Sequence, residues 1–236
     1  MNLTALADRF GSDKGTLTGD PPHRYSYLYD LVFTPYRDKE FRFLEMGLAV
    51  GGPELGGAID RTVTSPSIKM WLEYFSSAHI HGFDISDFSH MEHPRFTFIR
   101  GDSGSVADLE RLAASAPSFD IIIDDASHAS YHQQLALKIL FPSLTSGGLY
   151  IIEDLQWQPR LMEKELPPIP TTARFLNAYF ERAEYLENSL FSEAEMVDLK
   201  RNTAHFASFP NFGRKILLRQ FVRKETRTKL IIFRKR

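Results

Sequence analysis

The sequence predicts an α/β fold built on a doubly wound, mostly parallel sheet with helices on both faces. Two observations predict it. Five short apolar runs recur with helical patterns between them, and strands that alternate with helices are typical of βαβ units, whose crossovers produce parallel sheets. The runs that end in Asp124 and Asp154 are also continuous, as in strands that are buried on both faces. The expected strands are 41–46, 79–84, 95–100, 119–124 and 149–154.

The segments between these strands carry helix signals. Ser65 offers an N-cap and Pro66 a favoured first helical residue. Further helices are expected at 103–114 and at 130–140, the second of which stops before Pro142 and a Gly147-Gly148 turn. Two helices, at 3–10 and 25–33, precede the first strand and flank the polar loop GSDKGTLTGDPPH.

The region after the fifth strand is expected to hold a long loop, two helices and a hairpin. Residues 156–170 are rich in proline and polar residues, which is typical of a loop that covers a substrate site. Helices at 172–187 and 192–200 follow. Strands at 203–209 and 215–221 are expected to form an antiparallel hairpin at the sheet edge, which brings the sheet to seven strands.

One domain accounts for this organisation, since no repeat, low-complexity segment or linker divides the chain. Its parts are a helical N-terminal cover at 1–38, a core at 39–221 and a basic C-terminal extension at 222–236.

Composition excludes several classes of protein. Without cysteine, the chain has no disulfides, thiolate metal sites or thiol nucleophiles. The first ten residues lack the apolar run of a signal peptide, and no run reaches the roughly 18 apolar residues of a membrane span. A cytoplasmic location is therefore expected. The GxGxxG turn of dehydrogenases is missing after the first strand.

The charge is unevenly distributed. Between Gly213 and Arg236 there are ten Lys or Arg residues and one Glu, so the rest of the chain carries −11 although the whole chain carries −2. A segment of this kind can bind nucleic acid or an anionic membrane. The alternating apolar residues in the same segment favour the other interpretation, strands with basic solvent faces. Nucleic acid is accordingly not the expected partner.

Carboxylates follow every one of the five strands. Glu45 precedes the Gly47 turn after the first strand. The ends of the other four strands carry, in order, Asp84, Asp102-Ser103, Asp124-Asp125 and Glu153-Asp154. The carboxyl ends of parallel strands meet at one sheet edge, where such folds bind ligands. Each position taken alone also fits an ordinary tight turn or helix cap, but turns that were merely solvated would not be acidic at the same end of all five strands.

The order of these motifs resembles the class I S-adenosylmethionine-dependent methyltransferases, which have a Rossmann-like fold. More narrowly, SPSIKMWLEYF, GFDIS, IIDDASH and GGLYIIEDLQ, with the leading GSDKGT and HRYSYLY, are similar to metal-dependent sugar O-methyltransferases of the mycinamicin type. The resemblance covers residues 10–157. The IIDDASH and IEDLQ motifs are fairly specific, whereas the others are general to the superfamily.

The resemblance implies roles for particular residues. Asp125 and Asp154 would ligate Mg²⁺, and His128 would be the catalytic base. Glu45, Gly47 and Asp84 would hold the methionine amine and ribose of S-adenosylmethionine, with Asp102 and Ser103 near the adenine. Asp124 is grouped with these cofactor-binding residues, and Glu153 is a strand-end residue. Tyr25 would cover the cofactor, although Tyr25 and Tyr29 at helical spacing also fit packing.

The chain departs from the family in two places: its loop at 48–64 does not align with the family's cofactor loop, and Trp157-Gln158-Pro159 replaces the usual TSY. No third protein ligand for the metal can be placed. His132 lies one helical turn beyond His128, but a zinc pair is not expected, because the HExxH glutamate is absent.

These motifs predict a Mg²⁺-assisted O-methyltransferase that acts on a hydroxyl of a small glycosylated or polyol metabolite. Carboxylates are the oxygen ligands that Mg²⁺ prefers, and histidine can accept a hydroxyl proton near neutral pH. Two alternatives stay open: a catechol-type O-methyltransferase, and a methyltransferase-like binding module that uses the basic tail. The sequence also leaves a homo-oligomer open.

Overall fold

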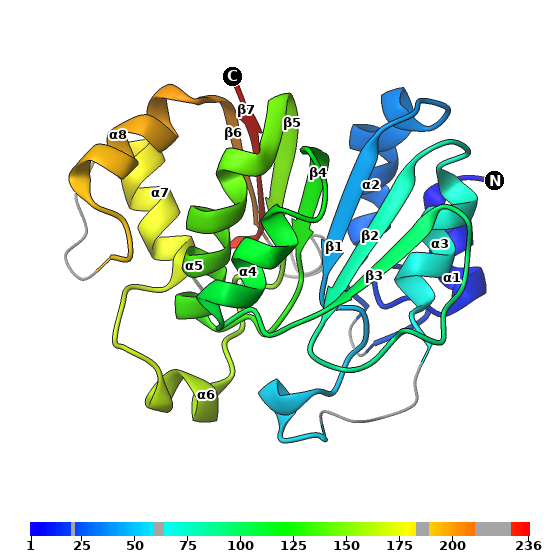
Figure 1. Cartoon of the computed structure of the whole chain (residues 1–236), viewed down its shortest axis with the longest axis horizontal. Helices are drawn as coiled ribbons and strands as arrows, with labels where there is room; N and C mark the ends of the chain where they lie inside the picture. The colour runs from blue at the N-terminus through cyan, green and yellow to red at the C-terminus, as the bar shows by residue number, and fades with distance from the viewer. Residues whose placement is uncertain (20–21, 59–63, 183–188, 211–227) are drawn as a thin grey trace, which may run out of the picture.

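A seven-stranded mixed sheet forms the centre of the part of the chain that the structure describes (Figure 1). The computed structural model describes residues 1–19, 22–58, 64–182, 189–210 and 228–236. The strand order is β3-β2-β1-β4-β5-β7-β6, with β1 to β5 parallel to one another and β7 antiparallel to both of its neighbours, β5 and β6. The strands are β1 Arg42–Met46, β2 His79–Asp84, β3 Phe96–Arg100, β4 Phe119–Asp124, β5 Leu144–Ile152, β6 Thr203–Pro210 and β7 Thr228–Lys235. The predicted fold class is confirmed.

Helices cover both faces of this sheet and create two apolar layers. The first face packs against α1 Leu3–Phe10, α2 Tyr25–Phe33 and α3 Pro66–Tyr74. The second packs against α4 Val106–Ala113, α5 Ser130–Leu140, α7 Thr172–Arg182 and α8 Glu193–Arg201. Because side chains alternate along a strand, neighbouring residues of β1 separate: Phe43 joins the first layer and Leu44 the second. Among the described helices, none combines the length and apolar character needed to cross a membrane.

The strand at 149–154 begins five residues earlier than predicted. β5 starts at Leu144, and its pairing with β4 shifts register between Phe119 and Ile121. Gly147 lies inside this strand with a φ of 79°, so the expected Gly147-Gly148 turn is an irregularity of the strand instead. A glycine at positive φ lets the strand absorb the register shift, as in a β-bulge.

Two helical expectations also change. The helix expected at 103–114 begins only at Val106, because Ser105 accepts a hydrogen bond from the main-chain N of Asp108 and is the N-cap. The loop at 156–170 contains a short helix, α6 Arg160–Glu165. Short 3₁₀ helices lie at Thr34–Tyr36, Pro53–Leu55 and Phe141–Ser143.

The C-terminal hairpin is present, but its second strand is β7. The strand expected at 215–221 lies outside the described residues, and β6 pairs with 228–235. Residues 228–235 were expected to belong to a basic extension beyond the core, and that prediction is wrong. Residues 230–233 (LIIF) are almost fully buried, and β7 pairs with β5 on one side and with β6 on the other. The basic residues there occupy a strand of the sheet, as in the second interpretation of the charged segment.

His81 gives this fold a specific pH dependence. Its side chain on β2 is buried, its ring packs edge-on against Phe119 and its Nδ1 has no hydrogen-bond partner. Burial, with a smaller contribution from the charge of His79, lowers the pKa of His81 to about 4. The unfolded chain therefore binds a proton at this residue more readily than the folded protein, so stability falls as pH drops from about 6.5 towards 4.

We expect His81→Phe to weaken this dependence. Between pH 7.5 and pH 5 the wild-type protein should lose about 1 to 2 kcal/mol more free energy of unfolding than the variant. Urea unfolding at both pH values measures the difference. His93→Phe, at an exposed position, is the control and should leave the dependence unchanged. Equal slopes for His81→Phe and the wild-type protein would show that His81 does not contribute.

Candidate active site

The ends of three central strands lie level with one another. Met46 of β1 pairs with Asp124 of β4, and Asp124 pairs with Ile152 of β5. The next residue continues the ladder each time: the main-chain N of Asp125 donates to the carbonyl of Met46 (2.9 Å), and that of Glu153 donates to the carbonyl of Asp124 (3.0 Å). The predicted gathering of carboxylates at one edge is therefore produced by strand register.

Strand alternation then sorts these carboxylates by face. Glu45 lies two residues after Phe43, Asp125 two after Ile123 and Glu153 two after Ile151, and these three apolar residues all belong to the layer under α1 to α3. Residues two apart point to the same side of a strand. Three acidic side chains from three strands consequently point towards the N-terminal helices.

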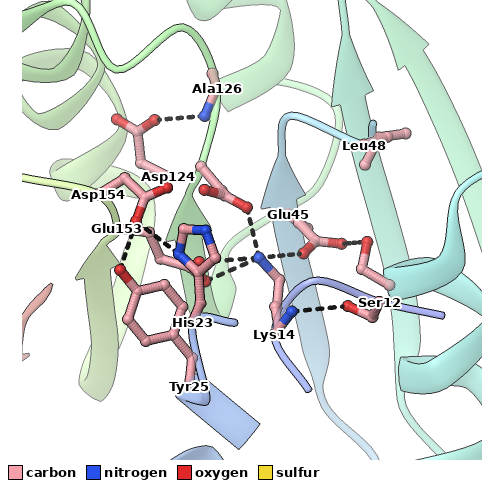
Figure 2. Close-up of polar contacts among 12 residues, drawn as sticks. Ser12, Lys14, His23, Tyr25, Glu45, Leu48, Asp124, Ala126, Glu153 and Asp154 are labelled. Carbon is pink, nitrogen blue, oxygen red and sulfur yellow. Dashed lines mark hydrogen bonds and ion pairs between the residues drawn. The ribbon is translucent and has the colours of Figure 1, made fainter. Parts of the chain in front are cut away.

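Lys14, in the loop after α1, lies among these three carboxylates (Figure 2). Its Nζ is 2.5 Å from Asp125 Oδ2, 2.9 Å from Glu153 Oε2 and 3.5 Å from Glu45 Oε1, and the residue is 1% exposed. Burial alone would lower the pKa of Lys14, but the three carboxylates together raise it well above its ordinary value. Lys14 is therefore a buried ammonium ion that neutralises part of the acidic cluster.

Asp154 is bound by the same N-terminal region. The hydroxyl of Tyr25 donates to Asp154 Oδ1 (2.5 Å), and His23 Nδ1 lies 3.0 Å from the same oxygen (Figure 2). Burial would raise the pKa of Asp154, but hydrogen bonds from His23 and Tyr25 and the nearby His128 outweigh it and lower the pKa. The neighbouring Tyr29 hydroxyl donates to Glu153 Oε1 (2.5 Å). Asp154 is thus held as a carboxylate.

The two predicted metal ligands and the predicted base come together. Ligand atoms of Asp125, His128 and Asp154 lie within 4.8 Å of one another, and this is the sole such group of three or more among the described residues. His128 and Asp154 have positive φ angles of 58° and 52°. With Arg24 they are the three described non-glycine residues in this strained region. Strained backbone concentrates at functional sites, and here all three residues belong to or adjoin one cluster.

The surroundings of His128 differ from those of an ordinary helix cap. Its ring meets Trp157 edge-on, with 5.5 Å between ring centroids, and its Nδ1 is buried without a hydrogen-bond partner. Trp157, which replaces part of the family's TSY, is 39% exposed. His132 instead bonds through Nδ1 to the hydroxyl of Ser127 (2.8 Å). Of the two histidines, His128 faces the carboxylates.

The residues predicted to bind the cofactor follow β1 and β2. Gly47 has a φ of 83°, and a Cβ there would overlap the main-chain oxygen of Asp125, so the turn after β1 lies directly against the loop after β4. Asp84 accepts main-chain hydrogen bonds from Leu48 and Ser86 at 2.7 Å each. These bonds match the turn role that the sequence left open, and contact with a ribose stays a prediction.

Glu45 and Asp124 are more deeply placed than cofactor contacts usually are. Glu45 is fully buried and accepts a hydrogen bond from Ser67 Oγ (2.7 Å). Burial raises the pKa of both Glu45 and Asp124 to about 7. Asp124 Oδ2 is buried and has no hydrogen-bond partner among the described residues.

Asp102 and Ser103 follow β3, on the far side of β1 from the metal candidates. Asp102 Oδ1 accepts a hydrogen bond from the main-chain N of Gly104 (2.8 Å). Ser103 is largely buried. Neither residue caps α4, as Ser105 does so. Their proximity to an adenine stays a prediction.

Sequence reasoning missed Lys14 and His23. Both lie in motifs that carried the family resemblance, yet neither was given a role in the site. A lysine in a polar loop has no periodicity that marks it as buried. The acidic residues at the strand ends were the signal that could have indicated Lys14, because carboxylates that are buried together require a nearby cation.

Comparison with known proteins identifies similar methyltransferases. The chain is 40% identical over 158 residues to demethylmacrocin O-methyltransferase of Streptomyces fradiae and 39% identical over 158 residues to mycinamicin VI 2''-O-methyltransferase of Micromonospora griseorubida. Each match covers 65% of this chain and 36% of the relative. No family model matches the chain.

A solved structure extends the likeness to the whole chain. The MycE methyltransferase of the mycinamycin biosynthetic pathway, solved with Mg and SAH, superposes with a TM-score of 0.69 at 27% identity. The match covers 100% of this chain and 54% of MycE. The chain has the class I methyltransferase fold. Its resemblance to the sugar O-methyltransferases is confirmed, and it spans about a third to a half of the length of these relatives.

The close contact between Gly47 and the main chain of Asp125 predicts that a larger residue at position 47 destabilises the protein. Gly47→Ala combines a positive φ with an overlap against Asp125, so we expect a loss of about 3 kcal/mol in the free energy of unfolding. Gly11→Ala is the matched control, because Gly11 has a φ of 73° but open space around its Cβ position. It should lose about 1 kcal/mol. Urea unfolding compares them, and equal losses would contradict the close contact.

Proposed function

We propose that this chain is an S-adenosylmethionine-dependent, Mg²⁺-assisted O-methyltransferase that acts on a sugar or polyol hydroxyl of a glycosylated metabolite. The cluster of Asp125, His128 and Asp154 carries the proposal, because it combines two oxygen ligands with a histidine at the ends of adjacent parallel strands. One relative is named for O-methylation of a rhamnosyl tetracenomycin and another for O-methylation of mycinamicin VI, and MycE was solved with Mg, SAH and mycinamycin VI.

The donor set fits a magnesium ion. Mg²⁺ binds through one or two carboxylates and completes its shell with water and substrate oxygens, and Asp125 and Asp154 supply two carboxylates within reach of each other. When bound there, the ion would lower the pKa of an acceptor hydroxyl, as metals do for bound water. Asp154 stays ionised, because its hydrogen bonds lower its pKa.

His128 would accept the proton from the acceptor hydroxyl. Its ring has a nitrogen within 4.8 Å of carboxylate oxygens of both Asp125 and Asp154. The edge contact with Trp157 fixes the ring, and a fixed base close to the reacting oxygen is what general base catalysis requires. S-adenosylmethionine would lie along the ends of β1 to β3, near Gly47, Asp84, Asp102 and Ser103, with its methyl group directed towards the acceptor oxygen.

Cofactor binding tests the core of the proposal. Titration calorimetry of the purified protein with S-adenosylhomocysteine should show saturable binding. Because Gly47, Asp84, Asp102 and Ser103 follow other strands than the metal candidates, a chelator should leave this affinity within about threefold while abolishing turnover. Turnover is measured with mycinamicin VI, demethylmacrocin and simple polyols as acceptors. A protein that binds neither S-adenosylmethionine nor its demethylated product would refute the proposal.

His128→Asn tests the base. Asparagine tolerates the positive φ at this position, so the substitution removes the imidazole without adding backbone strain. We expect kcat to fall about 10²- to 10⁴-fold, the usual contribution of a general base, with S-adenosylhomocysteine affinity retained. His93→Asn, at an exposed site, is the control. Turnover of His128→Asn close to wild type would remove His128 from the mechanism.

A further inference from the structure

Lys14 is held rigidly at the centre of the carboxylates. Besides its three ion pairs, its carbonyl accepts a hydrogen bond from the main-chain N of Ser26 (2.8 Å). The same loop is fixed to α1, where Asp8 accepts hydrogen bonds from the main-chain N and the hydroxyl of Thr16 at 2.5 and 2.6 Å. The ammonium group is therefore positioned by the fold and cannot readily withdraw from the site.

The N-terminal region occupies one oxygen of each candidate metal ligand. Asp125 Oδ2 is bonded to Lys14. Asp154 Oδ1 is bonded to Tyr25, His23 and Gln156. Throughout the described ranges, the other two oxygens, Asp125 Oδ1 and Asp154 Oδ2, accept no hydrogen bond. Each carboxylate thus has one engaged oxygen and one oxygen left for a ligand.

This division matters for the choice of metal ion. A carboxylate whose second oxygen already accepts a hydrogen bond from an ammonium or hydroxyl group presents mainly its other oxygen to a metal ion. Ca²⁺ takes six to eight oxygens and commonly uses both oxygens of a carboxylate, whereas Mg²⁺ takes six in near-octahedral geometry and binds carboxylates singly. Single-oxygen ligands consequently favour the smaller ion.

We propose that Lys14 is a positioning residue which, together with Tyr25, limits Asp125 and Asp154 to one metal-facing oxygen each and thereby makes the site select Mg²⁺ over Ca²⁺. This inference rests on the proposed metal site. It assigns the N-terminal loop a role in ion selectivity, in addition to its packing role over the sheet.

A purely structural counter-ion would behave differently. If Lys14 only neutralised charge, its removal would change the affinities for the two ions in parallel, because both carry the same charge. If it restricts coordination, its removal frees Asp125 Oδ2 and helps Ca²⁺ more than Mg²⁺. The ratio of the two dissociation constants separates these possibilities, whatever happens to stability.

Lys14→Met is the first test. Methionine keeps much of the side-chain length and removes the charge. Titration calorimetry of the metal-free protein with Mg²⁺ and with Ca²⁺ should show the ratio Kd(Ca)/Kd(Mg) falling at least about tenfold relative to wild type. Arg9→Met is the matched control, since it removes an exposed positive charge that pairs with Glu73 (2.6 Å) and lies over the Phe10 ring (5.0 Å). That variant should keep the wild-type ratio.

Tyr25→Phe gives a second test that does not remove a buried charge. It deletes the 2.5 Å bond to Asp154 Oδ1 but leaves His23 and Gln156 bound there. Because that oxygen stays engaged, the ratio should fall by no more than about threefold. If Lys14→Met does not fold, as judged by circular dichroism, the double variant Lys14→Met/Glu153→Gln, which removes the ammonium together with one of its buried carboxylate partners, replaces it and is compared with Glu153→Gln.

The possible results separate a failure of the selectivity role of Lys14 from a failure of the proposed metal site. A wild-type protein that binds Mg²⁺, with ratios unchanged in the folded variants, overturns the selectivity role and leaves the metal site in place. If the wild-type protein binds neither ion, both the proposed metal site and the selectivity inference fail.

Discussion

The salt-bridged ammonium of Lys14 is the interaction on which the site depends. Glu45, Asp125 and Glu153 point to one side of the sheet because of strand alternation, and buried carboxylates repel one another and lose hydration. Lys14 offsets this cost with ion pairs to all three. It also connects the loop after α1 to three strands that are far from it in sequence. The first helices are therefore bound to the site through charge as well as through apolar packing.

The same arrangement separates the roles of the acidic residues. Lys14 and Tyr29 both bond to the carboxylate of Glu153, and Asp124 turns to the opposite layer, where burial raises its pKa. Asp125 and Asp154 each keep one oxygen outside the hydrogen-bond network. Adjacent acidic residues in the sequence thus have different environments, because alternation and the turn at Asp154 send them in different directions.

Much of the fold could be predicted from the sequence because its signals are local. The short apolar runs predicted the bounds of β2 and β4, and caps such as Ser65 marked helix starts. The start of β5 and the place of β7 depend on register and on pairing between segments about eighty residues apart, which no local pattern records. In the site, Asp125, His128 and Asp154 were found from motifs. Lys14 was missed because its burial results from tertiary charge pairing.

The position of β7 affects the order in which the molecule can form during synthesis. β5 and β6 are each paired with β7 and are not neighbours in the sheet, and the main-chain N of Leu155, directly after Asp154, donates to the carbonyl of Lys229. On a ribosome, the first five strands emerge long before residues 228–235. Until β7 has been translated, the main-chain N of Leu155 lacks the carbonyl of Lys229 as its hydrogen-bond acceptor. The acidic turn after β5 is therefore completed late. Any chaperone or cofactor that acts on the nascent chain meets an open sheet edge next to the acidic cluster.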